Sequence, residues 1–213
     1  MSRVLPAGVV VLAACLAASA QAATQPFASS VSRVTAADLP YSYHRGCPVA
    51  PAQLRLLHVT FHGFDGKAHT GAIVVNAAVA TEIVAVFRQL YADDFPIRMM
   101  KPIDAFHGDD DLSMSADNTS GFNCRYAVTS GPKHWSAHAY GEAIDVNAVE
   151  NPYLEGSRVL PAKGAAYRDR SRIRPGMAVK GGQLVSAFAA VGWFWGGRWT
   201  GTPDYQHFSK TGG

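Results

Sequence analysis

The sequence predicts a single domain that mixes α-helices and β-strands. At 213 residues, the chain is long enough to bury one sizeable core and too short for two comfortable ones. It contains a hairpin pattern and an amphipathic helical pattern, and neither an internal repeat nor a composition shift divides it. The net charge is only +3 and the basic residues are dispersed, which argues against a nucleic-acid binder.

Residues 1–22 have the pattern of a secretory signal peptide. Arg3 precedes a mostly apolar stretch over residues 4–20, and Ala20-Gln-Ala22 has the small residues that signal peptidase accepts. The stretch is short and weakly apolar for a bilayer span. We therefore expect export, cleavage near Ala22 and no membrane span in the mature form. Leu12-Ala-Ala-Cys15 also resembles a lipobox, so a form anchored by a lipid on Cys15 is an alternative.

The next segments predict a lead-in followed by a hairpin. Residues 23–40 are rich in Ala, Ser and Thr without sustained periodicity, which predicts a mobile lead-in before the main domain at residues 41–213. Apolar and polar residues alternate loosely over residues 56–64, and a β-branched run follows at 71–76 after Asp65-Gly66. This pattern predicts a β-hairpin.

Two helices and two shorter strands are predicted in the rest of the chain. Residues 78–91 carry apolar side chains at three- and four-residue steps, which is typical of an amphipathic helix, and residues 183–191 predict a second helix. A strand is expected over 97–106 and a polar surface loop over 107–121. In a short strand over 141–147, Asp145 would lie on the face opposite Ile144 and Val146.

His138, Asp145 and His207 are the candidate metal ligands. A glycine-containing turn separates His138 from Asp145, and the sequence Asp204-Tyr-Gln-His207 supplies a second imidazole. Three protein ligands are typical of hydrolytic zinc, because the fourth position stays open for water. His138 beside Asp145 would by itself also fit a simple hydrogen-bonded pair.

Asp204 is the candidate general base because it lies three residues before His207. A carboxylate in this position would take a proton from the attacking water and pass it to the leaving amine. The alternative is a turn or cap residue after Pro203.

Cys47 and Cys124 are the cysteines that remain once the signal segment is removed. Exported proteins reach compartments where disulfides form and persist, so we expect a Cys47–Cys124 disulfide. Two separate buried thiols are the alternative.

At these residues the chain resembles the zinc D-alanyl-D-alanine carboxypeptidases and dipeptidases, and the related L-alanyl-D-glutamate endopeptidases of phage lysins. Their shared pattern is Ser-x-His-x-x-Gly-x-Ala-x-Asp, followed by an acidic residue three before a histidine. The matching residues are Ser136, His138, Gly141, Ala143, Asp145, Asp204 and His207, with Phe208 at a usual aromatic position. Residues 117–125 look like a signature of one subgroup. Carboxypeptidases more often carry glutamate where Asp204 stands, so this position looks more like the endopeptidase branch.

The resemblance implies an α+β domain in which helices pack against an antiparallel sheet that carries the zinc site. It implies a zinc-dependent metallopeptidase that acts on peptidoglycan stem peptides. Together with the signal pattern, it leads us to expect a protein that is secreted or in the cell envelope, and we expect a monomer. D-alanyl-D-alanine carboxypeptidase activity is the first expectation and L-alanyl-D-glutamate cleavage is the close alternative. A noncatalytic zinc-containing module that binds the cell wall is a second alternative.

The resemblance also directs attention to residues that would hold the substrate. Family members often carry a substrate-binding arginine on an upstream strand, but residues 103–107 contain none. Arg125 is the best substitute, because its guanidinium can hold a carboxylate or oxyanion; a structural arginine beside Cys124 is the alternative. Candidates for hydrogen bonds to the stem peptide are Ser115, Asn118, Ser120 and Ser136, although a polar turn explains the first three equally well. Four aromatic residues fit a cavity wall or, more commonly, core packing: Trp193, Trp195, Trp199 and Tyr205.

Overall fold

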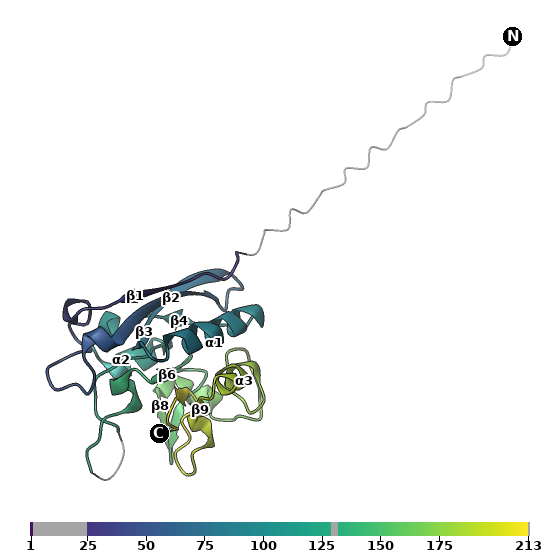
Figure 1. Cartoon of the computed structure of the whole chain (residues 1–213). Coiled ribbons are helices and arrows are strands. Elements are labelled where there is room, and N and C mark those ends of the chain that lie inside the picture. Colours follow the sequence, from purple (N-terminus) through teal and green to yellow (C-terminus); the bar gives the residue numbers. More distant parts are fainter. Residues whose placement is uncertain (2–24, 129–131, 213) are drawn as a thin grey trace.

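The computed structural model of the chain describes Met1, residues 25–128 and residues 132–212 (Figure 1). The predicted signal segment and the lipid anchor at Cys15 lie outside the described residues, apart from Met1. Within the described part, no helix is both long enough and apolar enough to cross a membrane.

The N-terminal part of the fold is a three-stranded antiparallel sheet with the order β1-β2-β3. Its strands are β1 (Ser29–Arg33), β2 (Leu54–His62) and β3 (Ala68–Asn76). The predicted hairpin is confirmed as β2 and β3, whose register runs from Leu54 opposite Asn76 to His62 opposite Ala68. Alternate β2 residues Leu57, Val59 and Phe61 enter the core, as the period of two requires.

One helix packs against this sheet and links it to the C-terminal part. The predicted amphipathic helix is confirmed as α1 (Ala80–Ala92), which buries Ile83, Val86, Phe87 and Leu90. Figure 1 shows α1 between the β1–β2–β3 sheet and the C-terminal elements β6, β9 and α3 (Gln183–Ala190). The helix predicted over residues 183–191 is therefore also found.

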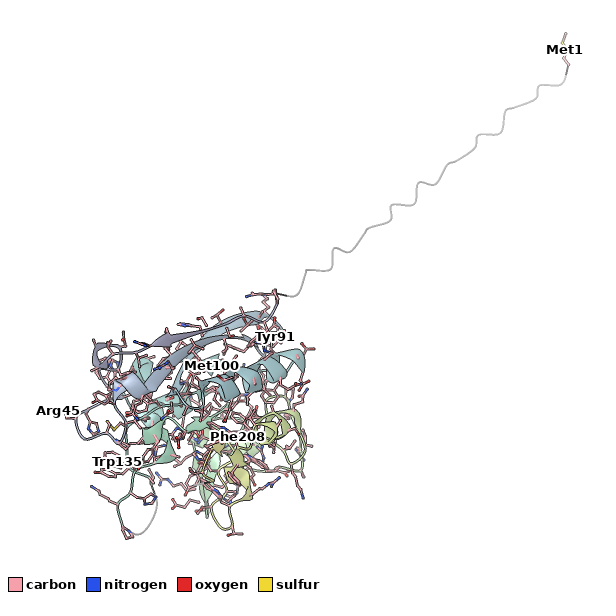
Figure 2. All side chains as sticks on the ribbon, viewed as in Figure 1. Met1, Arg45, Tyr91, Met100, Trp135 and Phe208 are labelled. Atoms are coloured by element: carbon pink, nitrogen blue, oxygen red, sulfur yellow. A yellow bond between two sulfur atoms is a disulfide. The ribbon has the colours of Figure 1, made fainter. Side chains whose placement is uncertain are left out.

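The C-terminal part is built on a second antiparallel sheet with the order β6-β10-β9. Its strands are β6 (Ala143–Asp145), β9 (Phe194–Trp195) and β10 (His207–Ser209). Ile144 of β6 and Phe208 of β10 are fully buried and share one apolar cluster with Leu57 and α1. Phe208 lies in the interior of the molecule (Figure 2), and its ring stacks on Phe188 of α3 at 4.2 Å between centroids. The α+β class and the antiparallel sheets agree with the prediction.

The expectation of a mobile lead-in over residues 23–40 does not fit the described part of that segment. Residues 29–33 form β1, and Val34 and Leu39 are buried in a second apolar cluster with Leu54. All five β1 side chains are exposed, so the strand carries no alternating apolar pattern that sequence reading could detect. It is held by backbone pairing with β2, from Ser29 opposite Val59 to Arg33 opposite Arg55.

The middle of the chain is more structured than predicted. The strand expected over 97–106 is only β4 (Met99–Met100) followed by a 3-10 helix, and the surface loop expected over 107–121 contains α2 (Asp110–Ser115) and β5 (Asn118–Thr119). The Asn118 side chain accepts a hydrogen bond from the Lys101 backbone N–H and donates one to the Lys101 carbonyl oxygen, which anchors this polar segment to the fold. A further hairpin joins β7 (Tyr153–Glu155) and β8 (Arg158–Leu160). The 3-10 helices are Ala36–Asp38, Pro51–Gln53, Ile103–Phe106, Ala137–Tyr140, Ala162–Tyr167 and Gly196–Arg198.

The predicted disulfide between Cys47 and Cys124 is present, with the two Cα atoms 5.8 Å apart. It connects the segment before β2 to the segment after β5, across a sequence separation of 77 residues. In the chain-entropy account, closing a loop of this size stabilises the fold by about 4 kcal/mol.

Candidate metal centre

A short 3-10 helix positions His138. The Ser136 hydroxyl accepts a hydrogen bond from the His138 backbone N–H at 3.3 Å and caps the helix Ala137–Tyr140. Gly141 ends this helix at φ +68°, and a Cβ there would lie only 2.6 Å from the backbone nitrogen of Asn76 on β3. The turn therefore requires glycine both for its backbone angle and for its contact with the first sheet.

Strand pairing brings the other two residues to the same place. In the β6–β10 register, His207 lies directly opposite Asp145. The Asp145 backbone also exchanges two hydrogen bonds with Ser120, at 2.9 and 3.0 Å. Asp145 is thus held between β10 and the segment that follows β5.

The side chains of His138, Asp145 and His207 converge. His138 Nε2 lies 3.2 Å from Asp145 Oδ2, His207 Nδ1 lies 3.2 Å from Asp145 Oδ1, and the two imidazole nitrogens are 3.2 Å apart. All three residues are buried, with exposed fractions of 3, 5 and 6%. These residues are therefore one group able to hold a metal ion.

The surroundings of this trio fit a zinc ion. His138 Nδ1 lies 2.7 Å from the carbonyl oxygen of Gly121, which can only accept, so Nδ1 donates and Nε2 is the nitrogen left to bind a metal once it loses its proton. Two imidazole nitrogens and one carboxylate then present lone pairs to a common point, the donor set of catalytic zinc. Manganese, nickel and other divalent ions accept similar ligands.

The charges of the trio are strongly coupled. Burial opposes ionisation of Asp145, but the charge of His138 and the hydrogen bonds from both imidazoles hold its pKa well below the usual range. Burial also acts to lower the pKa of His138, and the Asp145 carboxylate outweighs it and raises that pKa. For His207, burial prevails and lowers the pKa. The carboxylate therefore stays ionised and available as a ligand.

The trio lines a cavity of about 730 Å³. One wall comes from α2 and the segment just before it, and another from the β7–β8 hairpin, which contributes Tyr153, Arg158 and Leu160. Each strand of that hairpin has only three residues, which is too short for sequence periodicity to reveal. Trp199 also lines the cavity, and its ring lies 5.2 Å from the His207 ring.

Asp204 lies in the same cavity as the three candidate ligands. Its backbone N–H donates to Gly196 O at 3.1 Å, and a Cβ on Gly196 would lie 2.8 Å from Asp204 O and 3.2 Å from His207 Cβ. Asp204 Oδ1 is buried and has no hydrogen-bond partner among the described residues. Burial, and after it the charge of Asp145, raises the pKa of Asp204 well above its usual value.

Arg125 also faces this cavity, as its predicted role requires. Its Nη2 lies 2.7 Å from Asp110 Oδ2, and its Nε is buried without a partner among the described residues. Sequence reading did not identify Asp110, because it placed this residue in a surface loop instead of on α2. The N-cap pattern at Asp109, whose side chain accepts from Leu112 N, was the available signal.

Only some of the other predicted substrate residues lie at the cavity. Ser136 lines the cavity, whereas Ser115, Asn118 and Ser120 are not among the residues that line it. Among the aromatic residues, Trp193 is buried in the core as favoured, and Trp199 lies at the cavity. Trp195 and Tyr205 are half-buried, and Trp195 Nε1 donates to Tyr205 O.

A second group, His44, Cys47 and Cys124, also has closely spaced ligand atoms. Its two sulfur atoms are joined in the disulfide, so neither is a thiolate that could bind a metal. Among the described residues, the His138 trio is therefore the group that could hold a metal ion.

Comparison with known protein families gives one finding for this chain. A family model described as D-alanyl-D-alanine carboxypeptidase matches residues 129–210, a span that contains the trio and Asp204. No curated protein and no solved structure gives a match. The family resemblance inferred from the motifs is confirmed over these residues.

Proposed function

We propose that this chain, which matches the D-alanyl-D-alanine carboxypeptidase family over residues 129–210, is an exported zinc metallopeptidase that hydrolyses peptidoglycan stem peptides. The observation that carries the proposal is the convergence of His138, Asp145 and His207 in a cavity that Asp204 also lines. The Cys47–Cys124 disulfide supports action outside the cytoplasm, because disulfides persist in oxidising compartments.

The proposed zinc ligands are His138 Nε2, the Asp145 carboxylate and His207 Nδ1. A zinc ion bound there would polarise the scissile carbonyl and lower the pKa of water toward about 7. The hydrogen bond from His138 Nδ1 to Gly121 O fixes the orientation of one imidazole, and the β6–β10 register fixes the other relative to Asp145. This pre-orientation of the side chains supports their proposed role as ligands.

Asp204 is proposed as the general base that takes a proton from the attacking water and returns it to the leaving amine. A carboxylate with an ordinary pKa is a weak base at neutral pH, whereas the pKa of Asp204 is raised by its burial and by Asp145. Its unpartnered Oδ1 is free to accept that proton. A module that only binds the cell wall has no need for this group.

Arg125 is proposed to bind the substrate. Its guanidinium reaches the cavity, and Asp110 restrains it from one side. A substrate for carboxypeptidase cleavage ends in a carboxylate, which a guanidinium pairs with strongly, and the developing oxyanion is a second possible partner. This cationic group supports carboxypeptidase action as the first candidate. The aspartate at position 204 is the observation that supports the alternative, L-alanyl-D-glutamate cleavage.

Incubating the purified protein with muropeptides, with and without a chelator, tests this function. We expect zinc-dependent products: loss of one terminal alanine for carboxypeptidase action, or two larger fragments for endopeptidase action, which mass spectrometry separates. Absence of any zinc-dependent product would favour the noncatalytic module.

The role of Asp204 is tested by Asp204→Ala. We expect this variant to keep its zinc, measured by elemental analysis, and to lose about 10²- to 10⁴-fold in turnover, the usual contribution of a general base. Asp111→Ala is the matched control, because Asp111 is an exposed carboxylate that lines the same cavity. Undiminished turnover in Asp204→Ala would remove Asp204 from the mechanism.

A further inference from the structure

Gln206 is a buried polar residue that the proposed mechanism leaves without a role. It lies between Asp204 and His207 in sequence, is 2% exposed and lines the cavity. Its side-chain Oε1 has no hydrogen-bond partner among the described residues. Within the part of the chain that the structure describes, the one partner of its Nε2 is Met114 Sδ, at 3.3 Å. A thioether sulfur is a weak acceptor, so neither end of the amide is well satisfied.

Hydrogen bonds hold the backbone of Gln206 and of its two neighbours in place, so the side chain cannot reach a better partner through a backbone shift. Val146 N–H donates to Gln206 O at 3.0 Å, and Trp195 Nε1 donates to the carbonyl of the preceding Tyr205 at 2.9 Å. The following residue, His207, is fixed in β10. Turning the amide by half a rotation would only exchange the end that faces Met114 for the end without a partner. The amide is therefore held at the cavity wall with unused hydrogen-bonding capacity.

An unsatisfied buried amide costs free energy unless a ligand supplies the missing bonds. An amide offers one acceptor and one donor side by side, and a peptide group offers the complementary N–H and C=O. A charged carboxylate or ammonium would match only one of the two ends. The chemistry at this wall therefore matches the backbone of a peptide.

We propose that Gln206 determines specificity by hydrogen-bonding a backbone amide of the substrate next to the cleaved bond. This inference rests on the proposed peptidase function and assigns a binding role within the same cavity. It differs from a structural role, because an amide needed only for packing on Met114 could be replaced by an apolar side chain of similar length.

Gln206→Met tests this proposal with peptides in which each backbone amide flanking the cleaved bond is replaced in turn by an ester. An ester lacks the N–H, so at one position the wild-type kcat/KM should fall about tenfold, which corresponds to about 1.4 kcal/mol. Gln206→Met should cleave the all-amide peptide about tenfold less well and show no further loss with that ester. Its midpoint of thermal unfolding in chelator should equal or exceed that of the wild type, because the substitution removes an unsatisfied amide.

Gln183→Met is the matched control, since the Gln183 amide already donates to Asp93 O and lies outside the cavity. It should keep the wild-type preference for amide over ester. Equal losses for amide and ester peptides in Gln206→Met, or unchanged kcat/KM, would overturn the proposal.

Binding of the same peptides, measured by calorimetry with zinc-loaded protein that carries Asp204→Ala so that the peptides stay intact, separates this proposal from the peptidase function. A protein that cleaves none of the peptides would contradict the proposed function. A tenfold weaker Kd for the all-amide peptide in Gln206→Met would still support the role of Gln206, and an unchanged Kd would contradict it.

Discussion

The two three-stranded sheets of this protein differ in what their buried residues do. In β1-β2-β3, the strands β2 and β3 have nine residues each and, apart from Thr60, their buried side chains are apolar, such as Leu57 and Ile73. In β6-β10-β9 no strand exceeds three residues, and two of the strands each place a buried ionisable side chain next to a buried apolar one. Ile144 and Phe208 face the core, while the neighbouring Asp145 and His207 face the cavity.

This difference indicates that the first sheet mainly stabilises the fold, whereas the second sheet mainly positions the side chains of the cavity. Long regular strands bury continuous apolar surface, which is the main favourable term in folding. Short strands between loops can bring side chains from distant parts of the sequence to one point, but they bury groups that are costly without partners. We therefore expect changes in the first sheet to act on stability and changes in the second to act on metal binding and turnover.

The largest effect is expected from His138→Ala, which removes one ligand beside the second sheet. The variant should lose bound zinc and at least 10³-fold in turnover, because removing a ligand dismantles the metal site. Elemental analysis and muropeptide assays measure both. His134→Ala is the matched control, because His134 is an exposed histidine that lines the same cavity. Full zinc occupancy in His138→Ala would show that the ligand set is misassigned.

A smaller effect, confined to stability, is expected from Leu57→Ala in the first sheet. Leu57 is fully buried in the main apolar cluster, so the truncation should lower the free energy of unfolding by about 2 to 5 kcal/mol. Urea unfolding measures this change. At urea concentrations too low to unfold the variant, its zinc content and kcat should stay at wild-type values. A loss of zinc while the variant is still folded would contradict the proposed division between the sheets.

The smallest effect concerns Glu150, a buried carboxylate in the C-terminal part that lies outside the cavity. Its Oε1 lies 3.3 Å from Arg98 Nη2 and accepts from the Tyr167 hydroxyl at 3.3 Å. Burial, followed by the hydrogen bond with Asp117 and the charge of that residue, raises the pKa of Glu150 to about 7. In the unfolded chain the pKa returns to about 4.5.

Between pH 4.5 and 7 the folded state therefore binds more protons at Glu150 than the unfolded state does. The contribution of Glu150 is fully present below pH 4.5, and stability falls as the pH rises through 7, by no more than about 3 kcal/mol. Glu150→Gln should flatten this part of the stability profile, measured by urea unfolding in chelator from pH 5 to 8. Glu155→Gln, an exposed carboxylate on β7, should leave the profile unchanged. An equally steep profile in Glu150→Gln would assign the pH dependence to other groups.

The parts of the structure that sequence predicts well are those with strong local patterns. The β2–β3 hairpin and α1 follow from apolar periodicity, and the trio follows from the types and spacing of His138, Asp145 and His207. The disulfide was predictable because the chain has an export signal pattern and two cysteines remain after it, and disulfides persist in the oxidising compartments that exported proteins reach. The register that places His207 opposite Asp145 depends on tertiary pairing, which no local pattern encodes.

Other features were missed because they depend on distant contacts. β1 exposes every side chain and is stabilised by pairing with β2, so its sequence resembles a loop. The position of Asp110 beside Arg125 requires α2 to pack at the cavity, and polar residues favoured a loop there. Gln206 becomes notable only when its burial and missing partners are known.

With the proposed ligands, the register between β6 and β10 would link metal binding to docking of the C-terminal strand. The two strands pair over three residues, from His207 opposite Asp145 to Ser209 opposite Ala143. A slip of one residue would place Phe208 opposite Asp145 and turn the imidazole away from the carboxylate. An ion bound by Asp145 and His207 would add a cross-link between the strands that only the native register permits. The free energy by which strand docking strengthens metal binding would then equal the free energy by which metal binding stabilises the docked strand.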